Sequence, residues 1–260
     1  MPNHIVNIGD VELISLNDNL PLRSPFVAFP HTTIDQWNEY PELMADHENG
    51  KHRWGSLAIR SSGKLIVVDT GMQGEGCYLL DDMKEKGIDR DKVDIVVFTH
   101  VHPDHVGWNF TNGTPNFPNA RFLVPQKDWD YWTQPDVINT VEYVVPQVLP
   151  LQEMGVMDLI DGEYSITTEL TTYPTPGHTP GSICFSLEGS PVLFSGDTLF
   201  PGGPGATTFD GGDFAAIIES IDRRLFARID PRTIVMPGHG LDTTIGAERP
   251  SLDEWVARGW

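Results

Sequence analysis

The chain has 260 residues with 37 acidic and 17 basic side chains, which give a formal net charge of -20 at pH 7. Nucleic-acid binding is disfavoured, because phosphate contacts require a basic patch and the longest basic runs here are pairs such as Arg223-Arg224. The same charge disfavours strongly anionic small molecules as substrates.

The composition and the N-terminal sequence predict a soluble, cytoplasmic protein with no membrane partner. A hydrophobic content of 39% and a charged content of 21% are ordinary for a globular protein, and the length fits one domain over residues 1–260. Residues 1–7 lack the basic and apolar regions of a signal peptide, and no apolar run is long enough to span a membrane. Cys77 and Cys184 are predicted to be buried thiols rather than a disulfide.

Strands and helices are predicted to alternate along the chain. The first two strands are expected within 4–16, around the turn Gly9-Asp10, and a hairpin is expected from 54–60 and 64–69. A continuous apolar run at 93–99 predicts a strand buried on both faces. Later strands are expected at 121–124, 169–173, 182–187, 192–195 and 233–236. Helices are expected at 77–87, 126–133, 137–148 and 213–226, the last with Asp213 as its N-cap.

Residues 18–53 interrupt this pattern, because they are rich in proline, histidine and aromatic residues and have no clear period. Long irregular segments in compact domains are usually functional, and the aromatic content argues against disorder. We expect a lid or pocket wall here, with a homodimer contact as the alternative. Isolated histidines are expected to be ordinary core or surface residues, although those of the segment could also reach the active site: His4, His31, His47 and His52.

A compact histidine motif follows the predicted buried strand: His100-Val-His102-Pro-Asp104-His105. In extended chain His100 and His102 point the same way, and Pro103 then turns the chain. Asp104 and His105 are thereby directed to a neighbouring position. Imidazole nitrogens and carboxylate oxygens are the ligands of zinc, so this motif predicts a metal site.

Three further polar residues lie in Gly- and Pro-rich turns beside predicted strands: His178, Asp197 and His239. Together with the motif they provide enough ligands for two metal ions. The first group would be His100, His102 and His178, the second Asp104, His105 and His239, with Asp197 as the bridge. Asp69, at the end of another strand, is predicted to hold a ligand loop or a histidine in place.

The order and spacing of these residues resemble the metallo-β-lactamase fold superfamily, over most of the chain. The resemblance rests on the sequence pattern Asp69-Thr70-Gly71, His100-x-His102-x-Asp104-His105, His178, Asp197 and His239. It implies an α/β fold, a four-layer αββα sandwich. It also implies a dinuclear centre at one edge of the sandwich with two divalent metal ions, usually zinc and sometimes iron or manganese.

Two branches of the superfamily are similar in different parts of the sequence. Residues 175–181, 196–200 and 237–248 resemble glyoxalase II, but only 21 residues follow His239, too few for the helical domain that binds glutathione in full glyoxalase II. Residues 99–109 and the 18–53 insertion resemble the lactonase and organophosphate-hydrolase branch. Quorum-quenching lactonases usually carry tyrosine where this chain has Phe200, which weakens the assignment to acyl-homoserine lactones without excluding other esters or lactones.

The expected activity is hydrolysis of a neutral, hydrophobic ester or lactone by a hydroxide that bridges the two metals. Asp104 is predicted to be catalytic as well as a ligand, because it could orient the nucleophile and relay its proton. An aromatic substrate pocket is predicted from Trp54, Trp108 and Phe200. The candidates for a general acid are Tyr143, Tyr173 or a histidine of 18–53, and nothing in the sequence selects among them.

Three other functions stay open at this point. The first is a glyoxalase II-like thioesterase, and the second is a mononuclear iron oxidoreductase similar to persulfide dioxygenases. The third is a binding protein with structural metals. The last is disfavoured because structural zinc sites are closed and often rich in cysteine.

Overall fold

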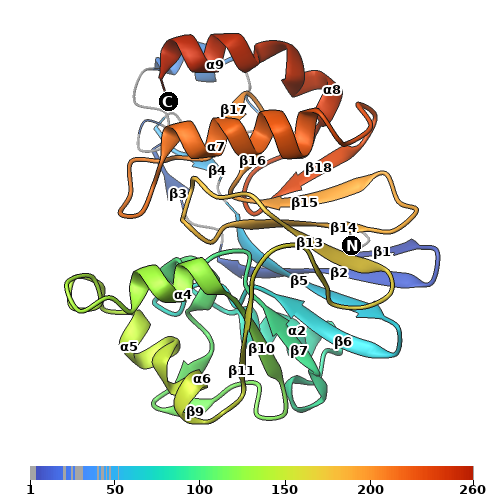
Figure 1. Ribbon diagram of the computed structural model, residues 1–260, viewed down its shortest axis with the longest axis vertical. Helices are drawn as coiled ribbons and strands as arrows, with labels where there is room; N and C mark the ends of the chain where they lie inside the picture. The colour runs from blue at the N-terminus through green and yellow to red at the C-terminus, as the bar shows by residue number, and fades with distance from the viewer. Residues whose placement is uncertain are drawn as a thin grey trace.

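Two β-sheets lie face to face, and helices cover the outer surface of each sheet (Figure 1). The computed structural model describes residues 4–19, 22–24, 26, 32–39, 41, 44, 46, 48–51 and 53–259. The predicted four-layer αββα sandwich is confirmed.

The first sheet comes from the N-terminal half of the chain. Within the described residues its strands, in spatial order, are β1 (Ile5–Ile8), β2 (Val11–Asn19), β5 (Trp54–Ser61), β6 (Lys64–Val68), β7 (Ile95–Val97), β10 (Arg121–Pro125) and β11 (Met157–Ile160). The pairs from β1 to β6 are antiparallel, and the pairs from β6 to β11 are parallel. The predicted strands of this half are confirmed, whereas β11 has no counterpart among the predictions.

The second sheet comes from the C-terminal half. In the described part of the chain its order is β12 (Tyr164–Ser165), β13 (Leu170–Pro174), β14 (Ile183–Leu187), β15 (Val192–Gly196), β18 (Ile234–Pro237) and β19 (Thr243–Thr244). The pairing is antiparallel from β12 to β15 and parallel between β15 and β18. Consequently β13, β15 and β18 run in the same direction, and their C-terminal ends meet at one edge.

Alternation along the strands builds three apolar cores. Val96 of β7 faces the helices of the first layer, whereas Val97 faces the second sheet. In β15, Leu193 faces the outer helices of the second layer, whereas Phe194 faces the space between the two sheets. Each such side chain contributes about 1.5–3 kcal/mol when it is fully buried, so the period-2 pattern fixes which face of each strand turns inward.

Helices of the first layer pack on the outer face of the first sheet (Figure 1). They are α2 (Leu79–Glu85), α3 (Pro103–Val106), α4 (Gln126–Trp132), α5 (Val144–Gln147) and α6 (Leu149–Glu153). The helix predicted at 137–148 is wrong over most of its length, because residues 135–140 form turns. There Asn139 Nδ2 donates to the Pro135 carbonyl and Thr140 Oγ1 donates to the Val137 carbonyl, and such local side-chain bonds compete with helix formation.

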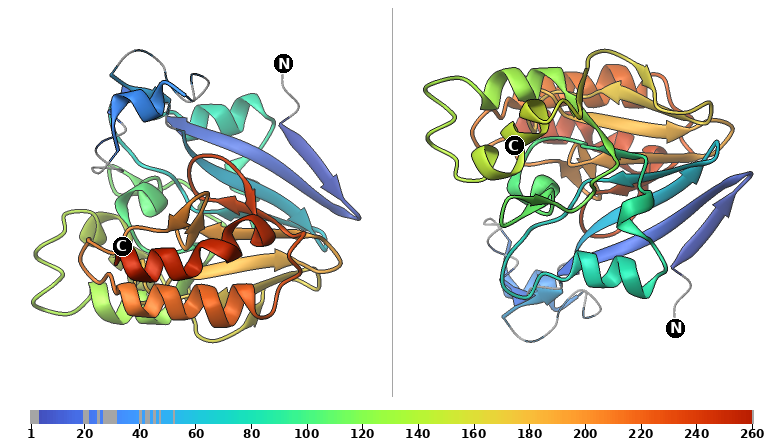
Figure 2. Two further views of the ribbon diagram at one scale, coloured as in Figure 1. Left: turned by 90° about the horizontal axis from the view of Figure 1, so that it is seen from above. Right: turned by 90° about the horizontal axis from the view of Figure 1, so that it is seen from below.

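Helices of the second layer cover the second sheet, as the view from above shows (Figure 2). They are α7 (Phe214–Ser220), which continues as a π-helix over Ile221–Phe226, α8 (Ile245–Glu248) and α9 (Leu252–Arg258). The prediction of a helix at 213–226 is confirmed, and the Asp213 side chain accepts from Ala216 N as its N-cap. Neither α8 nor α9 had been predicted.

The segment 18–53 is described only in part. It contains β3 (Leu22–Arg23) paired with β4 (Gly50–Lys51), and α1 (Ile34–Trp37), whose N-cap Thr33 forms a capping box with Gln36. His31, His47 and His52 lie outside the described residues, so their predicted roles stay predictions.

Further short ribbons lie outside the two main sheets. Short two-stranded ribbons pair β8 (Phe110–Thr111) with β9 (Thr114–Pro115) and β16 (Leu199–Phe200) with β17 (Gly203–Pro204). Cys184 is buried as predicted, Cys77 is only half-buried, and both are free thiols. Among the described residues, no helix has the length and apolar character needed to cross a membrane.

Candidate metal centre

Seven residues predicted as metal ligands gather at one edge of the sandwich. Each lies in a loop or a short helix that follows a strand of either sheet: His100, His102, Asp104 and His105 after β7, His178 after β13, Asp197 after β15 and His239 after β18. Loops at the ends of a rigid sheet hold side chains in fixed positions, which suits a metal centre. The structure therefore brings together residues from both halves of the chain.

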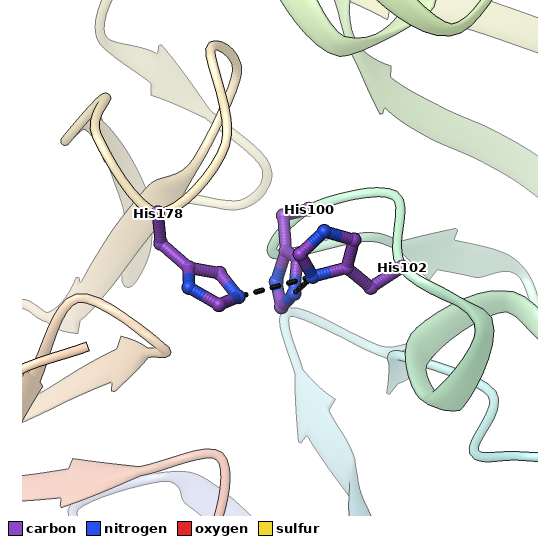
Figure 3. Close-up of side chains that lie close together, drawn as sticks. All are labelled: His100, His102 and His178. Atoms are coloured by element: carbon purple, nitrogen blue, oxygen red, sulfur yellow. Dashed lines mark hydrogen bonds between the residues drawn. The ribbon is translucent and has the colours of Figure 1, made fainter. Parts of the chain in front are cut away.

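His100, His102 and His178 form the first group of potential ligands. His102 Nδ1 lies 3.1 Å from His100 Nε2 and 3.0 Å from His178 Nε2, and Figure 3 shows the three rings converging from two separate loops. One ligand atom from each residue lies within 4.8 Å of those of the other two. The spacing allows all three nitrogens to bind one ion.

Two of these rings make a hydrogen bond on the side that faces away from the centre of the group, and this bond sets the tautomer of each ring. A carbonyl only accepts, so His178 Nδ1 donates to Ala206 O at 2.6 Å and leaves a lone pair on its Nε2. The Thr99 hydroxyl donates to Asp69 Oδ2 at 2.7 Å, and it therefore accepts from His100 Nδ1 at 3.1 Å. His100 Nε2 then also presents a lone pair to the centre of the group.

His102 Nδ1 faces both of those lone pairs and can donate at most one proton. Burial, with the neighbouring histidines, lowers the pKa of His102 to about 3, so the ring is neutral at pH 7. Burial also holds the pKa of His100 well below its ordinary value. A cation at the centre of the group would satisfy all three nitrogens, as in three-histidine zinc sites.

Asp104, His105 and His239 form the second group. His239 Nε2 lies 3.4 Å from Asp104 Oδ2, and His105 Nε2 lies 3.9 Å from Asp104 Oδ1. His105 Nδ1 donates to Asp69 Oδ2 at 2.8 Å, which leaves its Nε2 directed inward. That nitrogen is buried and makes no hydrogen bond within the described part of the chain. In the neutral ring this nitrogen would present its lone pair to a metal ion.

Asp197 lies between the two groups. Its Oδ2 is 3.8 Å from His178 Nε2 and 3.5 Å from His239 Nε2, and its Oδ1 is 3.9 Å from His105 Nε2. Oδ1 is buried and has no hydrogen-bond partner among the described residues. His100, His105 and Asp197 also form a close set, so the two groups are contiguous. This placement fits a carboxylate shared by two ions.

Glycines allow the Asp197 loop to approach its neighbours. A Cβ at Gly205 would lie 1.8 Å from the Asp197 carbonyl oxygen, and one at Gly238 would lie 2.4 Å from Asp197 Oδ1. Gly196 has a positive φ of 49° and packs against Thr99. A larger side chain at Gly238 would displace the Asp197 carboxylate, and one at Gly205 or Gly196 would displace the loop that carries it.

Negative charge accumulates around His105. Burial alone would lower the pKa of this histidine, but the carboxylates of Asp69, Asp104 and Asp197 together raise it to about 10. The site therefore favours positive charge at this point, which a divalent ion would supply. The unpartnered buried atoms and this excess of carboxylate charge both fit the presence of metal ions.

Asp69 contacts both Thr99, the residue before the histidine motif, and the candidate ligand His105. Besides His105, it accepts from Thr99 N and Thr99 Oγ1, each at 2.7 Å. Its backbone has a positive φ of 59°, which is strained for a residue other than glycine. Next to it, Thr70 N donates to the His105 carbonyl at 2.7 Å, so this loop also holds the backbone of the histidine motif.

Asp128 connects the two histidine loops and was not predicted. This fully buried residue of α4 accepts from Val101 N at 2.7 Å, in the middle of the histidine motif. It also accepts from Thr179 Oγ1 at 3.0 Å and from Gly181 N at 2.6 Å, in the loop that carries His178. Burial raises the pKa of Asp128 to about 6 against these hydrogen bonds. The only sequence signal was its position just after a strand that ends at this edge.

The aromatic residues predicted to line the pocket have different surroundings. Trp108 Nε1 donates to Asp18 at 2.8 Å and its ring packs on the first core, which favours a structural role. Phe200 is half-buried and lies beside Gly205, in contact range of the Asp197 loop. Trp54 is half-buried at the start of β5.

The two tyrosines considered as general acids also differ. Tyr143 Oη donates to the Val101 carbonyl at 3.1 Å, and burial raises its pKa above the ordinary value. Tyr173 Oη accepts from Ser186 Oγ at 3.2 Å within the second sheet. Tyr143 therefore supports the histidine motif, and Tyr173 supports a strand pair.

Comparison with known proteins identifies the family. The sequence profile described as "Metallo-beta-lactamase superfamily" matches residues 56–239, which include all seven candidate ligands. The chain belongs to this superfamily. Superfamily relatives include hydroxyacylglutathione hydrolase GloC of Haemophilus influenzae, 47% identical over 202 residues that cover 75% of this chain and 89% of that protein. The probable metallo-hydrolase YqgX of Bacillus subtilis is 28% identical over 198 residues, with coverages of 73% and 86%.

Solved structures share the fold over a longer part of the chain. The hydrolase AbOPH of the beta lactamase superfamily superposes with a TM-score of 0.74 at 22% identity, covering 91% of this chain and 89% of that one. AidC, a dizinc quorum-quenching lactonase, superposes with a TM-score of 0.69 at 18% identity and coverages of 90% and 89%. These similarities extend the superfamily fold beyond the range matched by the profile.

Proposed function

We propose that this chain is a dinuclear metal-dependent hydrolase of a neutral, hydrophobic ester or lactone. The observation that carries the proposal is the pair of contiguous ligand groups, with Asp197 between them and inward-facing nitrogens fixed by outer hydrogen bonds. Two divalent ions at such a centre supply a hydroxide nucleophile at neutral pH and polarise the carbonyl oxygen of the substrate. Zinc suits the nitrogen and carboxylate donors, and iron or manganese are the alternatives.

Residues around the ligands keep their lone pairs directed inward. The Ala206 carbonyl and the Thr99 hydroxyl accept the outer protons of His178 and His100, and Asp69 accepts that of His105. Outer partners of this kind typically change metal affinity or activity by about 10–100-fold when they are removed.

We assign to Asp104 the orientation of the attacking water and the relay of its proton. Burial alone would raise its pKa, but His105 and His239 hold the pKa of Asp104 well below its ordinary value. Its side chain is 25% exposed, more than that of Asp197 at 12%, so it is the more accessible carboxylate of the two. The low pKa keeps the carboxylate ionised, so it can accept a hydrogen bond from the attacking water and orient it, whereas the same low pKa makes Asp104 a weak base for full proton transfer.

The charges around the centre favour a neutral substrate. In the described part of the chain, the ion pairs and hydrogen bonds of the seven ligands involve imidazoles, carboxylates, a hydroxyl and a backbone carbonyl, and no lysine or arginine. Within these contacts, a substrate with several negative charges would meet the carboxylates of the ligands and no lysine or arginine. An uncharged ester or lactone avoids this repulsion.

The test is chelator-sensitive hydrolysis of p-nitrophenyl acetate and of a simple γ-lactone by metal-loaded protein. We expect turnover that a chelator abolishes and that added zinc or manganese restores. His102→Ala should lower kcat/KM at least about 100-fold, whereas His4→Ala, outside the site, should leave it unchanged. Undiminished turnover in the His102→Ala protein would contradict the proposal.

A thioesterase is the second candidate, and the 47% identity to hydroxyacylglutathione hydrolase GloC favours it. The same centre would act on a thioester carbonyl. Rates on S-lactoylglutathione and on p-nitrophenyl acetate, measured with one preparation, separate the two candidates. A kcat/KM at least about 100-fold higher for the thioester would assign the second function. A ratio of that size means that the centre binds the transition state of thioester hydrolysis much more tightly than that of ester hydrolysis.

A further inference from the structure

Phe209 lies exposed beside the first ligand group. Its ring centroid is 5.9 Å from that of His102 and 6.3 Å from that of His178, at interplanar angles of 78° and 84°. The side chain is nevertheless 58% exposed. The ring therefore contacts two candidate ligands and leaves much of its apolar surface to solvent.

The loop that carries Phe209 is held at both ends. At its start Gly205 N donates to the Thr198 carbonyl at 3.1 Å, and at its end Asp213 N donates to the Gly177 carbonyl at 2.7 Å. The loop also supplies the carbonyl that accepts from His178 Nδ1, so its position is coupled to a ligand.

Close packing fixes the middle of the same loop. Gly211 has a positive φ of 81°, and a Cβ there would lie 3.0 Å from both the Tyr131 ring and Pro180. Gly212 N donates to the Phe209 carbonyl at 2.9 Å, which closes the turn. The exposure of Phe209 is therefore a property of an anchored turn and not of a loose chain.

We propose that Phe209 is a specificity-determining residue that covers the apolar acyl chain of the substrate. This inference rests on the proposed function, because it places the substrate carbonyl at the two ligand groups. The Phe209 ring lies next to His102 and His178, so an alkyl chain that extends from such a carbonyl past these two histidines would lie against the ring. Covering the ring with an alkyl chain removes apolar surface of both from water.

Asp210, the residue after Phe209, favours an acyl chain without charge. Asp210 is exposed and adds a negative charge to the same turn, which disfavours an acyl chain that ends in a carboxylate. Trp132 also lies next to His102, with its ring centroid 5.7 Å from that of the histidine, but it is buried. Phe209 is exposed beside the same histidine, so its ring is the one of the two that an apolar chain can cover from solvent.

The test measures binding rather than turnover. Metal-loaded protein is titrated by calorimetry with acetate, butanoate, hexanoate and octanoate, the carboxylate products that such esters would release. A fully buried methylene strengthens binding about 4-fold, and one face of a ring covers only part of each, so we expect about 2-fold per added carbon. Phe209→Ala should bring this increment close to 1 while acetate binding is unchanged, and Phe209→Leu should retain part of it.

Val256→Ala provides the matched control, because Val256 is a 51% exposed apolar residue on α9, in the outer layer. It should behave like the wild type. An undiminished chain-length dependence in Phe209→Ala, its absence in the wild type, or an equal loss of acetate and octanoate binding would each overturn the proposal.

Rates on p-nitrophenyl acetate and p-nitrophenyl octanoate, measured in parallel, separate this inference from the proposed function. If the wild type binds carboxylates with the expected increment and Phe209→Ala loses it, but neither protein hydrolyses an ester, the proposed function fails and the contact of Phe209 with the acyl chain stands. If esters are hydrolysed with equal kcat/KM by the wild type and Phe209→Ala at both chain lengths, the assignment of Phe209 fails and the function stands.

Discussion

Replacing Asp128 with asparagine tests how the two histidine loops are held together. The side chain keeps its size but loses its charge, and one of its two oxygens becomes an NH2 group. Asp128 Oδ2 accepts from Val101 N and Thr179 Oγ1, and Oδ1 accepts from Gly181 N. In either orientation of the amide, the new NH2 faces at least one buried donor, and that donor loses its acceptor.

The magnitude follows from these contacts. Each buried donor left without a partner costs about 1–3 kcal/mol, so Asp128→Asn should lower the free energy of unfolding of the metal-free protein by about that amount or more. Because the loops carry His102 and His178, metal affinity should also fall, by about 10–100-fold. Urea unfolding measures the first effect, and competition with a chromophoric chelator measures the second.

Asp130→Asn on the same helix is the control, because the Asp130 carboxylate is exposed and accepts from Gln126 Nε2. It should change neither quantity measurably. If Asp128→Asn retained both the unfolding midpoint and the metal affinity of the wild type, the connection between the loops through Asp128 would be refuted.

Three further predictions concern the ligands, the glycine contacts and acid stability. Asp197→Asn should reduce bound metal below the wild-type content while circular dichroism stays unchanged; a full metal content would contradict the shared position of Asp197. Gly205→Ala should lower the free energy of unfolding by about 1–3 kcal/mol, because its Cβ would lie 1.8 Å from a carbonyl oxygen, whereas Gly74→Ala, with open space around it, should not. Hydrogen bonds from Ser61, Ser62 and neighbouring threonines lower the pKa of Glu169 to about 2, so its contribution to stability is present above pH 4.5 and is lost as the pH falls towards 2. The wild type should therefore lose more stability than Glu169→Gln between pH 5 and pH 2.5 in urea unfolding, and parallel losses would disprove the role of Glu169.

The fold could be predicted from the sequence where the signal is local. The run at 93–99 and the alternation of the other strands determine which side chains face each core, and these strands are observed. The helix predicted at 137–148 failed because Asn139 and Thr140 bond to nearby carbonyls, a competition that apolar periodicity does not register.

The candidate site could be predicted where residues carry unusual chemistry, and not where ordinary residues gain importance from contacts. Histidines at close spacing indicate metal ligands, and the structure brings them together. Asp128 bonds to groups that lie 27 to 53 positions away in sequence, so no local pattern marks it. Phe209 lies in a Gly-rich stretch without the hydrophobic periodicity of a helix or strand, so the sequence does not mark it. The sequence around Trp108 does not distinguish a tryptophan that lines a pocket from one that packs on the core.

The most direct test of the dinuclear centre is elemental analysis of protein purified without added metal. We expect about two divalent ions per chain, zinc or else manganese or iron, with a lower content in the His102→Ala protein. A content near one iron per chain, with oxygen uptake and no ester hydrolysis, would contradict this expectation and assign a mononuclear oxidoreductase. A metal-free protein that cannot be loaded would contradict any metal-dependent function.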